Sequence, residues 1–332
     1  MPAGSTAQPA LSSLPFELCL AVPYNHRVSG PFSMPINATT RYCAVYGHPI
    51  KHSASPAMQN AGIAALGLNW RYLAFEVHPN DLRPAIEGAK KMNYIGLNLT
   101  VPHKLLAFDF VDVLDESAKL WGAVNTIRFE GKDSSGAWQP LREFADAPRE
   151  IRSHGFNTDA DAITRALKEE LGIHLAGAKV LQLGAGGAGR TAALKLASEN
   201  ISELYLVNRT QKKAEDVAAE IRARHPKVKV HTSYPTGKVD LVLNATSVGL
   251  KADDPVPYLD EQFDLRRAEA VYDMIYRPAQ TLLLQSAKAA GCRTANGIGM
   301  LLYQGAKALE IWTGQPAPID TMREALEKNV YG

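Results

Sequence analysis

The chain has 332 residues, 46% of them hydrophobic, and a formal net charge of +2. This length exceeds the size at which one hydrophobic core usually stops growing, so we expect two domains. The small net charge gives no electrostatic reason to expect a nucleic acid or an anionic membrane as partner, and no apolar run approaches the ~20 residues of a membrane-spanning helix. These features favour a small-molecule partner.

The cysteines and the first residues indicate where the protein functions. Cys19, Cys43 and Cys292 lie far apart, without the spacing of a disulfide framework or a zinc site. Residues 1–40 are rich in Pro, Ser and Ala and lack the charged start and long apolar core of a secretion signal. We therefore expect a flexible N-terminal extension, no metal and a cytoplasmic location.

From Arg41, short apolar runs alternate with helical patterns, which predicts an α/β domain with a largely parallel sheet. The strands are expected within residues 42–47, 72–77 and 94–101, and the helices within 55–67 and 81–92. Residues 130–153 combine Gly, Pro, Ser and charged residues without sustained periodicity. We interpret that stretch as a long surface excursion.

A helix is predicted from Asn157 to Gly172, with Asn-Thr-Asp as its start signal and glycine as its stop. It is expected to link the two domains. Beyond it the alternation resumes in the order typical of a doubly wound parallel sheet. The predicted strands are 179–184, 203–208, 228–232, 240–246 and 270–276, the helices between them 190–199 and 211–225, and the closing helices 297–312 and 321–329.

A glycine-rich turn separates the first of these strands from the helix that follows it. Its residues are Gly184, Ala185, Gly186, Gly187, Ala188 and Gly189, which satisfy G-x-G-x-x-G. In this position the glycines permit a tight turn and a close backbone approach to a pyrophosphate, and backbone N–H groups at the helix start face the anion. The turn predicts dinucleotide binding.

The end of the next strand indicates which dinucleotide. NAD sites usually place Asp or Glu there, to accept a hydrogen bond from the ribose 2′-hydroxyl. This chain has Asn208, Arg209 and Thr210 instead, with Lys213 on the following helix. A guanidinium group can pair with a 2′-phosphate, which favours NADP. The alternative is that Arg209 and Lys213 are solvated charges only.

Two polar clusters in the first domain could form a substrate site. Ser53 and Ser55 lie two residues apart after a strand and can both face a cleft, although Ser55 before a proline could equally cap a helix. Asn98, Thr100 and Lys104 lie at the end of another strand. A lysine held in a cleft can take part in proton transfer.

Taken together, the motifs resemble the shikimate dehydrogenase family. They occur in the family's order at residues 47–60, 96–104, 122–126, 155–159, 184–190, 208–210, 244–249 and 299–306. The resemblance extends from Arg41 nearly to the C-terminus. It implies an N-terminal substrate-binding domain, 41–157, completed by residues 297–332, and a Rossmann-like NADP-binding domain, 158–296.

The resemblance also implies an activity, the reversible NADPH-dependent reduction of 3-dehydroshikimate to shikimate in aromatic amino-acid biosynthesis. Lys104 and Asp159 match the catalytic pair. The matching substrate-binding residues are Ser53, Ser55, Asn98, Thr100, Asn125, Tyr276 and Gln304. Besides the glycine-rich turn, the matching cofactor-binding residues are Asn208, Arg209, Thr210, Lys213, Thr246, Ser247 and Gly297. The chemistry agrees, because reduction of a ketone by hydride requires a proton donor and no metal.

Some features depart from the family pattern or leave alternatives open. Ala160-Asp161-Ala162 follows the catalytic aspartate where the family commonly has glycines, and the 130–153 excursion exceeds the usual compact form. A sibling enzyme acting on quinate or an aminated shikimate, with NADP or NAD, is one alternative. A non-catalytic ligand sensor is another, although a sensor is expected to have lost Lys104 and Asp159. We expect a monomer or a homodimer.

Overall fold

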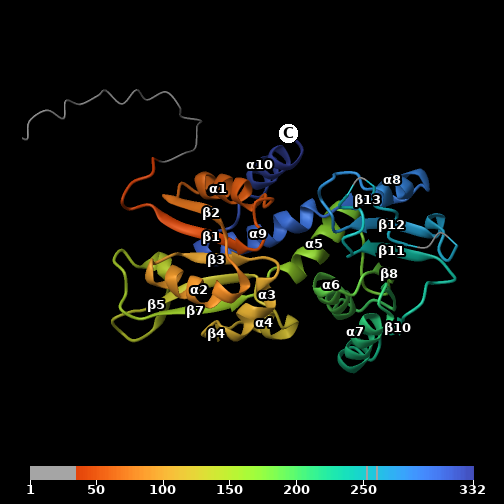
Figure 1. Ribbon diagram of the computed structural model, residues 1–332, viewed down its shortest axis with the longest axis horizontal. Helices are drawn as coiled ribbons and strands as arrows, with labels where there is room; N and C mark the ends of the chain where they lie inside the picture. Colours follow the sequence, from red (N-terminus) through yellow and green to blue (C-terminus); the bar gives the residue numbers. More distant parts are fainter. Residues whose placement is uncertain (1–34, 252, 259–260) are drawn as a thin grey trace, which may run out of the picture. The chain divides into compact units, whose positions relative to one another are not determined.

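Two β-sheets organise the chain (Figure 1). The computed structural model describes residues 35–251, 253–258 and 261–332, so most of the predicted N-terminal extension, residues 1–34, lies outside it. The described residues form one unit. At its start Asn37 and Thr40 form a turn, and the Thr40 hydroxyl donates a hydrogen bond to Asn69 Oδ1 at 2.9 Å.

The first sheet, seven-stranded over the described residues, runs in the order β2-β1-β3-β5-β7-β4, with β6 beside β5. Its strands are β1 (Arg41–Gly47), β2 (Trp70–Glu76), β3 (Gly96–Leu99), β4 (Val113–Leu114), β5 (Thr126–Lys132), β6 (Trp138–Pro140) and β7 (Ile151–Phe156). The predicted strands are confirmed, and so is the largely parallel arrangement, because β1, β2, β3, β4, β6 and β7 all run in the same direction. The exception is β5. β5 runs antiparallel to β3, β6 and β7. Apolar runs locate strands and carry no information on their direction.

The prediction of a surface excursion over residues 130–153 is wrong at both ends and at β6. The end of β5, all of β6 and the start of β7 fall within it, and Glu130, Leu141 and Ser153 are buried. The strand pattern was hidden because a charged residue occupies a buried position. Three partners compensate the Glu130 carboxylate: Arg128, Arg152 at 2.7 Å and His154 Nδ1 at 3.0 Å. Burying a carboxylate is tolerated only when it is paired in this way.

We expect Glu130→Gln to destabilise the protein. Burial alone would raise the pKa of this carboxyl group, but hydrogen bonds from His154, Arg128 and Arg152 outweigh it and lower the pKa to about 2. Hydrogen bonds to charged groups contribute about 2 kcal/mol, so we expect a loss of that order in the free energy of unfolding at pH 7. The measurement is denaturant unfolding of both proteins.

The same substitution predicts a pH dependence. A carboxyl group whose pKa is lowered by folding stabilises the native state above its unfolded pKa, near 4.5, and loses that contribution as the pH falls towards 2. The stability difference between wild type and Glu130→Gln should therefore shrink over that interval. A difference that stays constant would contradict this account. Glu150→Gln, which removes an exposed carboxylate paired with Lys132, is the control and should change little.

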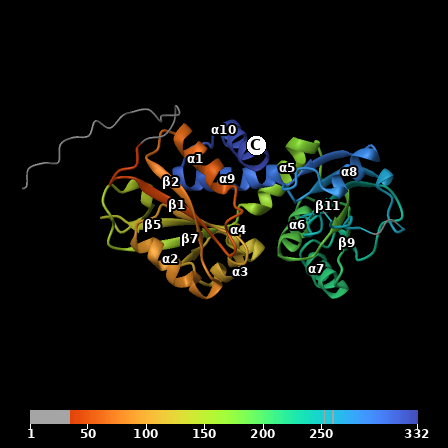
Figure 2. The ribbon, with the colours of Figure 1, turned by 45° about the horizontal axis from the view of Figure 1, so that its top comes forward.

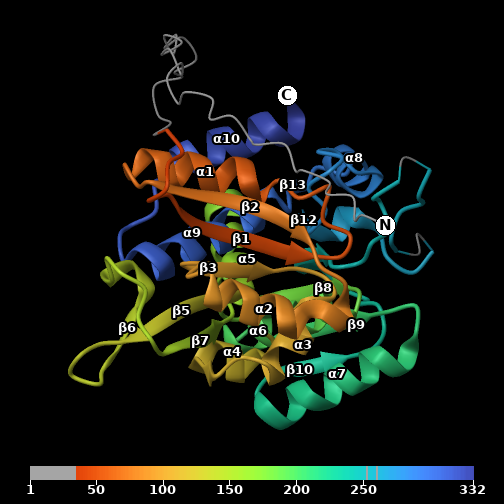
Figure 3. The ribbon, with the colours of Figure 1, turned by 60° about the vertical axis from the view of Figure 1, so that its left-hand side comes forward.

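Helices cover both faces of the first sheet (Figure 3). α1 (Ser55–Ala65) packs on one face with α9 (Ile298–Thr313) and α10 (Ile319–Tyr331), and α2 (Leu82–Lys91) lies on the other with the short α3 (His103–Leu106) and α4 (Glu116–Trp121). The closing helices therefore return to the first sheet, as predicted. Gln59 Nε2 donates to the Gly305 carbonyl at 2.8 Å, and Trp312 Nε1 to the Ile127 carbonyl at 2.9 Å.

The second sheet is entirely parallel, in the order β10-β9-β8-β11-β12-β13. Numbered from its first strand this is 3-2-1-4-5-6, the dinucleotide-binding order. Its strands are β8 (Lys179–Leu183), β9 (Glu203–Val207), β10 (Lys229–His231), β11 (Val239–Asn244), β12 (Ala268–Asp273) and β13 (Arg293–Asn296). Helices α6 (Gly187–Ser198) and α7 (Gln211–Arg224) lie on one face and α8 (Leu282–Ala289) on the other (Figure 1). Among the described strands of this sheet and the helices on its faces, β13 and α8 were not predicted.

Helix α5 (Asp159–Leu171) runs between the sheets beside α9 (Figure 2). It ends where predicted, at Gly172, whose left-handed φ of 61° suits glycine. Short 3₁₀ helices complete the fold at Pro79–Asp81, Ala107–Asp109, Leu141–Glu143 and Leu265–Arg267. No helix among the described residues is long and apolar enough to cross a membrane.

Candidate active site

A cavity of about 280 Å³ lies where the carboxyl ends of β1 and β3 meet α5 and α9. Parallel strands deliver their following loops to the same edge of a sheet, which is where α/β proteins bind ligands. The cavity brings together most of the predicted catalytic and substrate-binding residues: Ser53, Ser55, Asn98, Thr100, Lys104, Asp159, Tyr276 and Gln304. Gly297 also lines it, whereas Asn125 does not.

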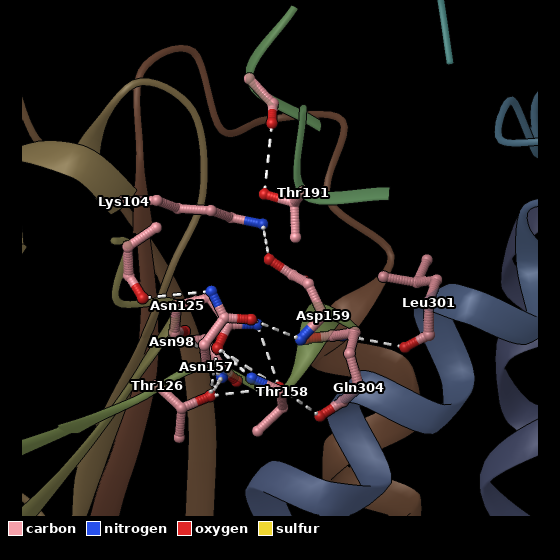
Figure 4. Close-up of polar contacts among 12 residues, drawn as sticks. Asn98, Lys104, Asn125, Thr126, Asn157, Thr158, Asp159, Thr191, Leu301 and Gln304 are labelled. Carbon is pink, nitrogen blue, oxygen red and sulfur yellow. Dashed lines mark hydrogen bonds and ion pairs between the residues drawn. The ribbon is translucent and has the colours of Figure 1, made fainter. Parts of the chain in front are cut away.

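Lys104 and Asp159 form an ion pair in the wall of this cavity (Figure 4). Lys104 Nζ donates to Asp159 Oδ2 at 2.7 Å, with 31% of the lysine side chain and 12% of the aspartate side chain exposed. Asp159 is the first residue of α5, where the helix dipole favours a negative charge. The amine is thereby held in one orientation at a surface that a ligand can reach.

Backbone hydrogen bonds fix the segments that carry this pair. The backbone N–H of Asp159 donates to Asn157 Oδ1 at 3.1 Å, and Asn157 Nδ2 donates to the Ala123 carbonyl at 3.1 Å. The backbone N–H of Val124 donates to the Lys104 carbonyl at 2.9 Å. Both charged residues are therefore anchored to the segment that joins α4 to β5.

The structure decides between the two interpretations of Ser55. The residue before α1 is Ala54, and no side chain caps the helix, so the expectation that Ser55 could serve as its N-cap is wrong. Ser53 and Ser55 both line the cavity instead. Two hydroxyl groups in one wall can donate hydrogen bonds to a carboxylate.

A buried hydrogen-bond network supports the floor of the cavity (Figure 4). Tyr72 donates to Asn98 Oδ1 at 2.7 Å, and Asn98 Nδ2 donates to Thr126 Oγ1 at 3.0 Å. Asn125 Oδ1 accepts from the Thr158 backbone at 2.8 Å. Because these amides already have partners, their orientations are set before any ligand arrives.

Helix α9 and the loop after β12 supply the remaining wall. The Thr158 hydroxyl donates to the Gln304 carbonyl at 3.0 Å, and Gln304 Nε2 donates to the Leu301 carbonyl at 2.8 Å (Figure 4). Burial raises the pKa of Tyr276, so its hydroxyl stays protonated and remains a donor.

Sequence reasoning did not single out His52, Met274 or Met300, which also line the cavity. His52 lies within the serine motif, and Met300 lies in the motif that contains Gln304, so each could have been found by its position there. Met274 had no such signal, because it lies within a predicted strand, 270–276, and directly follows β12 in the structure.

The glycine-rich turn fits a dinucleotide. Helix α6 begins at Gly187, and no side chain caps it, so its first N–H groups have no side-chain partner. A Cβ added at Gly186 or Gly187 would meet nothing within 4 Å, whereas one at Gly189 would lie 2.4 Å from the Gly184 carbonyl oxygen. Gly184 itself has a φ of 104°, which favours glycine. The turn is thus an uncovered anion site at a helix N-terminus.

The other predicted cofactor residues lie at the carboxyl edge of the second sheet, with Arg209, Thr210 and Lys213 exposed. Asn208 Oδ1 accepts from the Ala185 backbone at 3.0 Å and so ties the end of β9 to the glycine-rich turn. Elsewhere on this edge, Thr246 and Ser247 follow β11 and Gly297 follows β13.

The surroundings of Arg209 and Gly297 bear on their predicted roles in cofactor binding. Within the described part of the chain no hydrogen bond or ion pair occupies the Arg209 side chain, which leaves its guanidinium group available for an anion. Gly297 has a packing requirement of its own, because a Cβ there would lie 2.1 Å from the Met274 carbonyl oxygen. Across the described residues, no group of three or more His, Cys, Asp or Glu side chains could hold a metal ion.

Three protein-family models match consecutive parts of the chain. The shikimate dehydrogenase substrate-binding domain matches residues 45–127, shikimate/quinate 5-dehydrogenase matches 165–250, and the shikimate 5′-dehydrogenase C-terminal domain matches 297–327. Together these matches contain Lys104, the glycine-rich turn and Gln304.

Individual proteins are similar over nearly their whole length. The shikimate dehydrogenase (NADP+) of Methanopyrus kandleri is 40% identical over 302 residues, which cover 89% of this chain and 97% of the relative. A shikimate dehydrogenase solved with NADP+ has a TM-score of 0.78 at 36% identity, covering 92% of this chain and 100% of that one. The 5-ketofructose reductase of Gluconobacter sp. strain CHM43 has a TM-score of 0.73 at 33% identity, covering 88% and 99%. This chain belongs to the shikimate dehydrogenase family.

Proposed function

We propose that the protein is an NADP-dependent shikimate dehydrogenase, which reversibly reduces 3-dehydroshikimate to shikimate in aromatic amino-acid biosynthesis. The observation that carries the proposal is the Lys104–Asp159 pair, with a 2.7 Å contact in the wall of a cavity that Ser53 and Ser55 also line. The substrate domain comprises residues 41–157 with 297–332, and the cofactor domain residues 158–296. The protein acts in the cytoplasm as a monomer or homodimer.

Some residues of the cavity bind the substrate, and Lys104 transfers the proton. Ser53 and Ser55 bind the substrate carboxylate, and Thr100, Tyr276 and Gln304 contact the ring and its hydroxyl groups. Asn98 and the buried Asn125 support the floor of the cavity. Lys104 donates a proton to the C3 oxygen as charge develops there, and takes one up in the oxidation. Asp159 orients the ammonium group and remains a carboxylate. NADPH, when bound, supplies the hydride.

The cofactor is held at the edge of the second sheet. The turn, Gly184 to Gly189, holds the pyrophosphate through the N–H groups from Gly186 onward. Those of Gly184 and Ala185 already donate to the Val207 carbonyl and to Asn208 Oδ1. Asn208, Thr210, Lys213, Thr246, Ser247 and Gly297 complete the binding surface. Arg209 pairs with the 2′-phosphate that distinguishes NADP from NAD.

Arg209→Ala is expected to raise KM for NADP by about tenfold or more, because a charge-assisted hydrogen bond is lost, and to leave KM for NAD within about twofold. Initial rates with each cofactor at saturating shikimate give both values. An equal effect on the two cofactors would contradict the assignment of Arg209. Lys212→Ala is the matched control, since Lys212 lies on α7 beside Lys213 but pairs with Asp216 at 2.8 Å.

Substrate choice is tested in the reductive direction. NADPH oxidation is followed with 3-dehydroshikimate, 3-dehydroquinate and 5-ketofructose under one set of conditions. The proposal predicts the highest kcat/KM for 3-dehydroshikimate. A higher value for 5-ketofructose, which has no carboxylate for Ser53 and Ser55, would overturn the substrate assignment, and no reduction of any of them would favour the ligand-sensor alternative.

A further inference from the structure

Two arginines of the second sheet's helices reach the end of α4, which belongs to the first sheet. Arg190 of α6 donates through Nη1 to the Trp121 carbonyl at 3.2 Å. Arg224 of α7 donates through Nη1 to the Leu120 carbonyl at 2.9 Å. These are the last two residues of α4, whose C-terminal carbonyls lack partners within the helix and carry the negative end of its dipole. The guanidinium groups therefore cap α4 from outside.

Glu220 of α7 holds both arginines in place. Arg190 binds it with two parallel contacts, Nε to Oε2 at 2.8 Å and Nη2 to Oε1 at 2.6 Å. Arg224 Nη2 lies 2.8 Å from the same Oε1. A bidentate arginine–carboxylate contact fixes the plane of the guanidinium group, and the shared carboxylate reduces the repulsion between the two cations. We call Arg190, Glu220 and Arg224 the α4 clamp.

The segment that the α4 clamp holds leads to Lys104. Helix α4 ends at Gly122, in the left-handed conformation, and the chain then reaches Val124, whose backbone N–H donates to the Lys104 carbonyl at 2.9 Å. Lys104, Trp121 and Arg190 line a second hollow of about 390 Å³, together with Gly187 of the glycine-rich turn. Through Arg190 the clamp thus borders the space between the lysine and that turn.

We infer that the α4 clamp positions Lys104 relative to the glycine-rich turn. The inference rests on the proposed function, in which the glycine-rich turn binds the cofactor and Lys104 donates the proton. Arg190, Glu220 and Arg224 touch neither the substrate cavity's wall nor the reacting atoms, so they are positioning residues. Displacement of a catalytic group by about 1 Å can lower turnover by about 10²-fold, even when the mutation lies far from the reacting atoms.

The test is the double variant Arg190→Met/Arg224→Met, which keeps the apolar length of both side chains. We expect kcat for shikimate oxidation to fall about tenfold while KM for shikimate stays within about threefold, since the substrate-binding side chains are untouched. Hydrogen exchange of residues 115–126 should accelerate because α4 loses its caps. Arg222→Met is the matched control. Arg222 also lies on α7, but it donates to the carbonyl of Val230 in β10 at 2.8 Å, so its contact stays within the second sheet and does not reach α4.

A double-mutant cycle separates positioning from a general loss of stability. Because both arginines act through Glu220, the effects of Arg190→Met and Glu220→Gln on kcat should be strongly non-additive. A double variant that matches Arg222→Met in kcat and in hydrogen exchange overturns the inference. If the wild-type protein lacks shikimate activity, the proposed function fails, and hydrogen exchange of residues 115–126 still shows whether the clamp holds α4. If exchange there is the same in the double variant as in the wild type, the inference that the clamp holds α4 is overturned whatever the activity.

Discussion

Lys104→Met is expected to lower kcat for shikimate oxidation by about 10³-fold, within the range that general acid–base catalysis contributes. Methionine keeps most of the apolar length of the side chain and removes the amine that pairs with Asp159 at 2.7 Å. KM for shikimate should change by less than about threefold, because binding rests chiefly on hydroxyl and amide groups elsewhere in the cavity. Steady-state kinetics in the oxidative direction measure both quantities.

The control for this variant is Lys91→Met, which removes an exposed lysine from the end of α2. It should leave both constants near the wild-type values. Retention of more than a tenth of the wild-type kcat by Lys104→Met would remove the lysine from proton transfer.

Asp159→Asn is expected to lower kcat by about 10²-fold. Asparagine has the same shape and is also accepted at a helix start, so the fold and the melting temperature should change little. We expect kcat to fall because the substitution removes the negative charge that orients the Lys104 ammonium group. Because the two residues act as a unit, the double variant with Lys104→Met should be scarcely slower than Lys104→Met alone.

Asp161→Asn is the matched control for Asp159→Asn. Asp161 lies one residue further along α5 than Ala160, is largely exposed and pairs with Lys195 at 2.9 Å. The structure directs its carboxylate to Lys195, away from the cavity. Its replacement should leave kcat unchanged, which would show that the extra carboxylate of the Ala160-Asp161-Ala162 departure has no effect on turnover. A loss comparable to that of Asp159→Asn would mean that the total negative charge at the start of α5, and not the contact of Asp159 with Lys104, sets kcat.

Local patterns predicted most elements, because an apolar strand or an amphipathic helix is encoded within a few adjacent residues. Lys104 and Asp159 illustrate the limit, since nothing in their separate motifs places an amine and a carboxylate in contact. That pairing came from the family resemblance, and the geometry supplies its physical basis. The direction of β5 and the burial of Glu130 were missed for a similar reason, because both depend on partners such as Arg152 in another strand.

The α4 clamp is a second example of tertiary contacts that local sequence patterns do not reveal. Arg190 follows the glycine-rich turn and Arg224 is the last residue of α7, and nothing in either position indicates a contact with α4. Only the fold brings both to Glu220 and to the end of α4. Tertiary contacts of this kind have no signature in a single sequence.

The most direct test of the central claim is the initial rate of cofactor reduction in four combinations, shikimate or quinate with NADP or NAD, under one set of conditions. The account predicts that shikimate with NADP has the highest kcat/KM, because the cavity presents paired serines to a carboxylate and Arg209 is available for the 2′-phosphate. A preference for quinate or for NAD would contradict it and assign the protein to a sibling activity within the family.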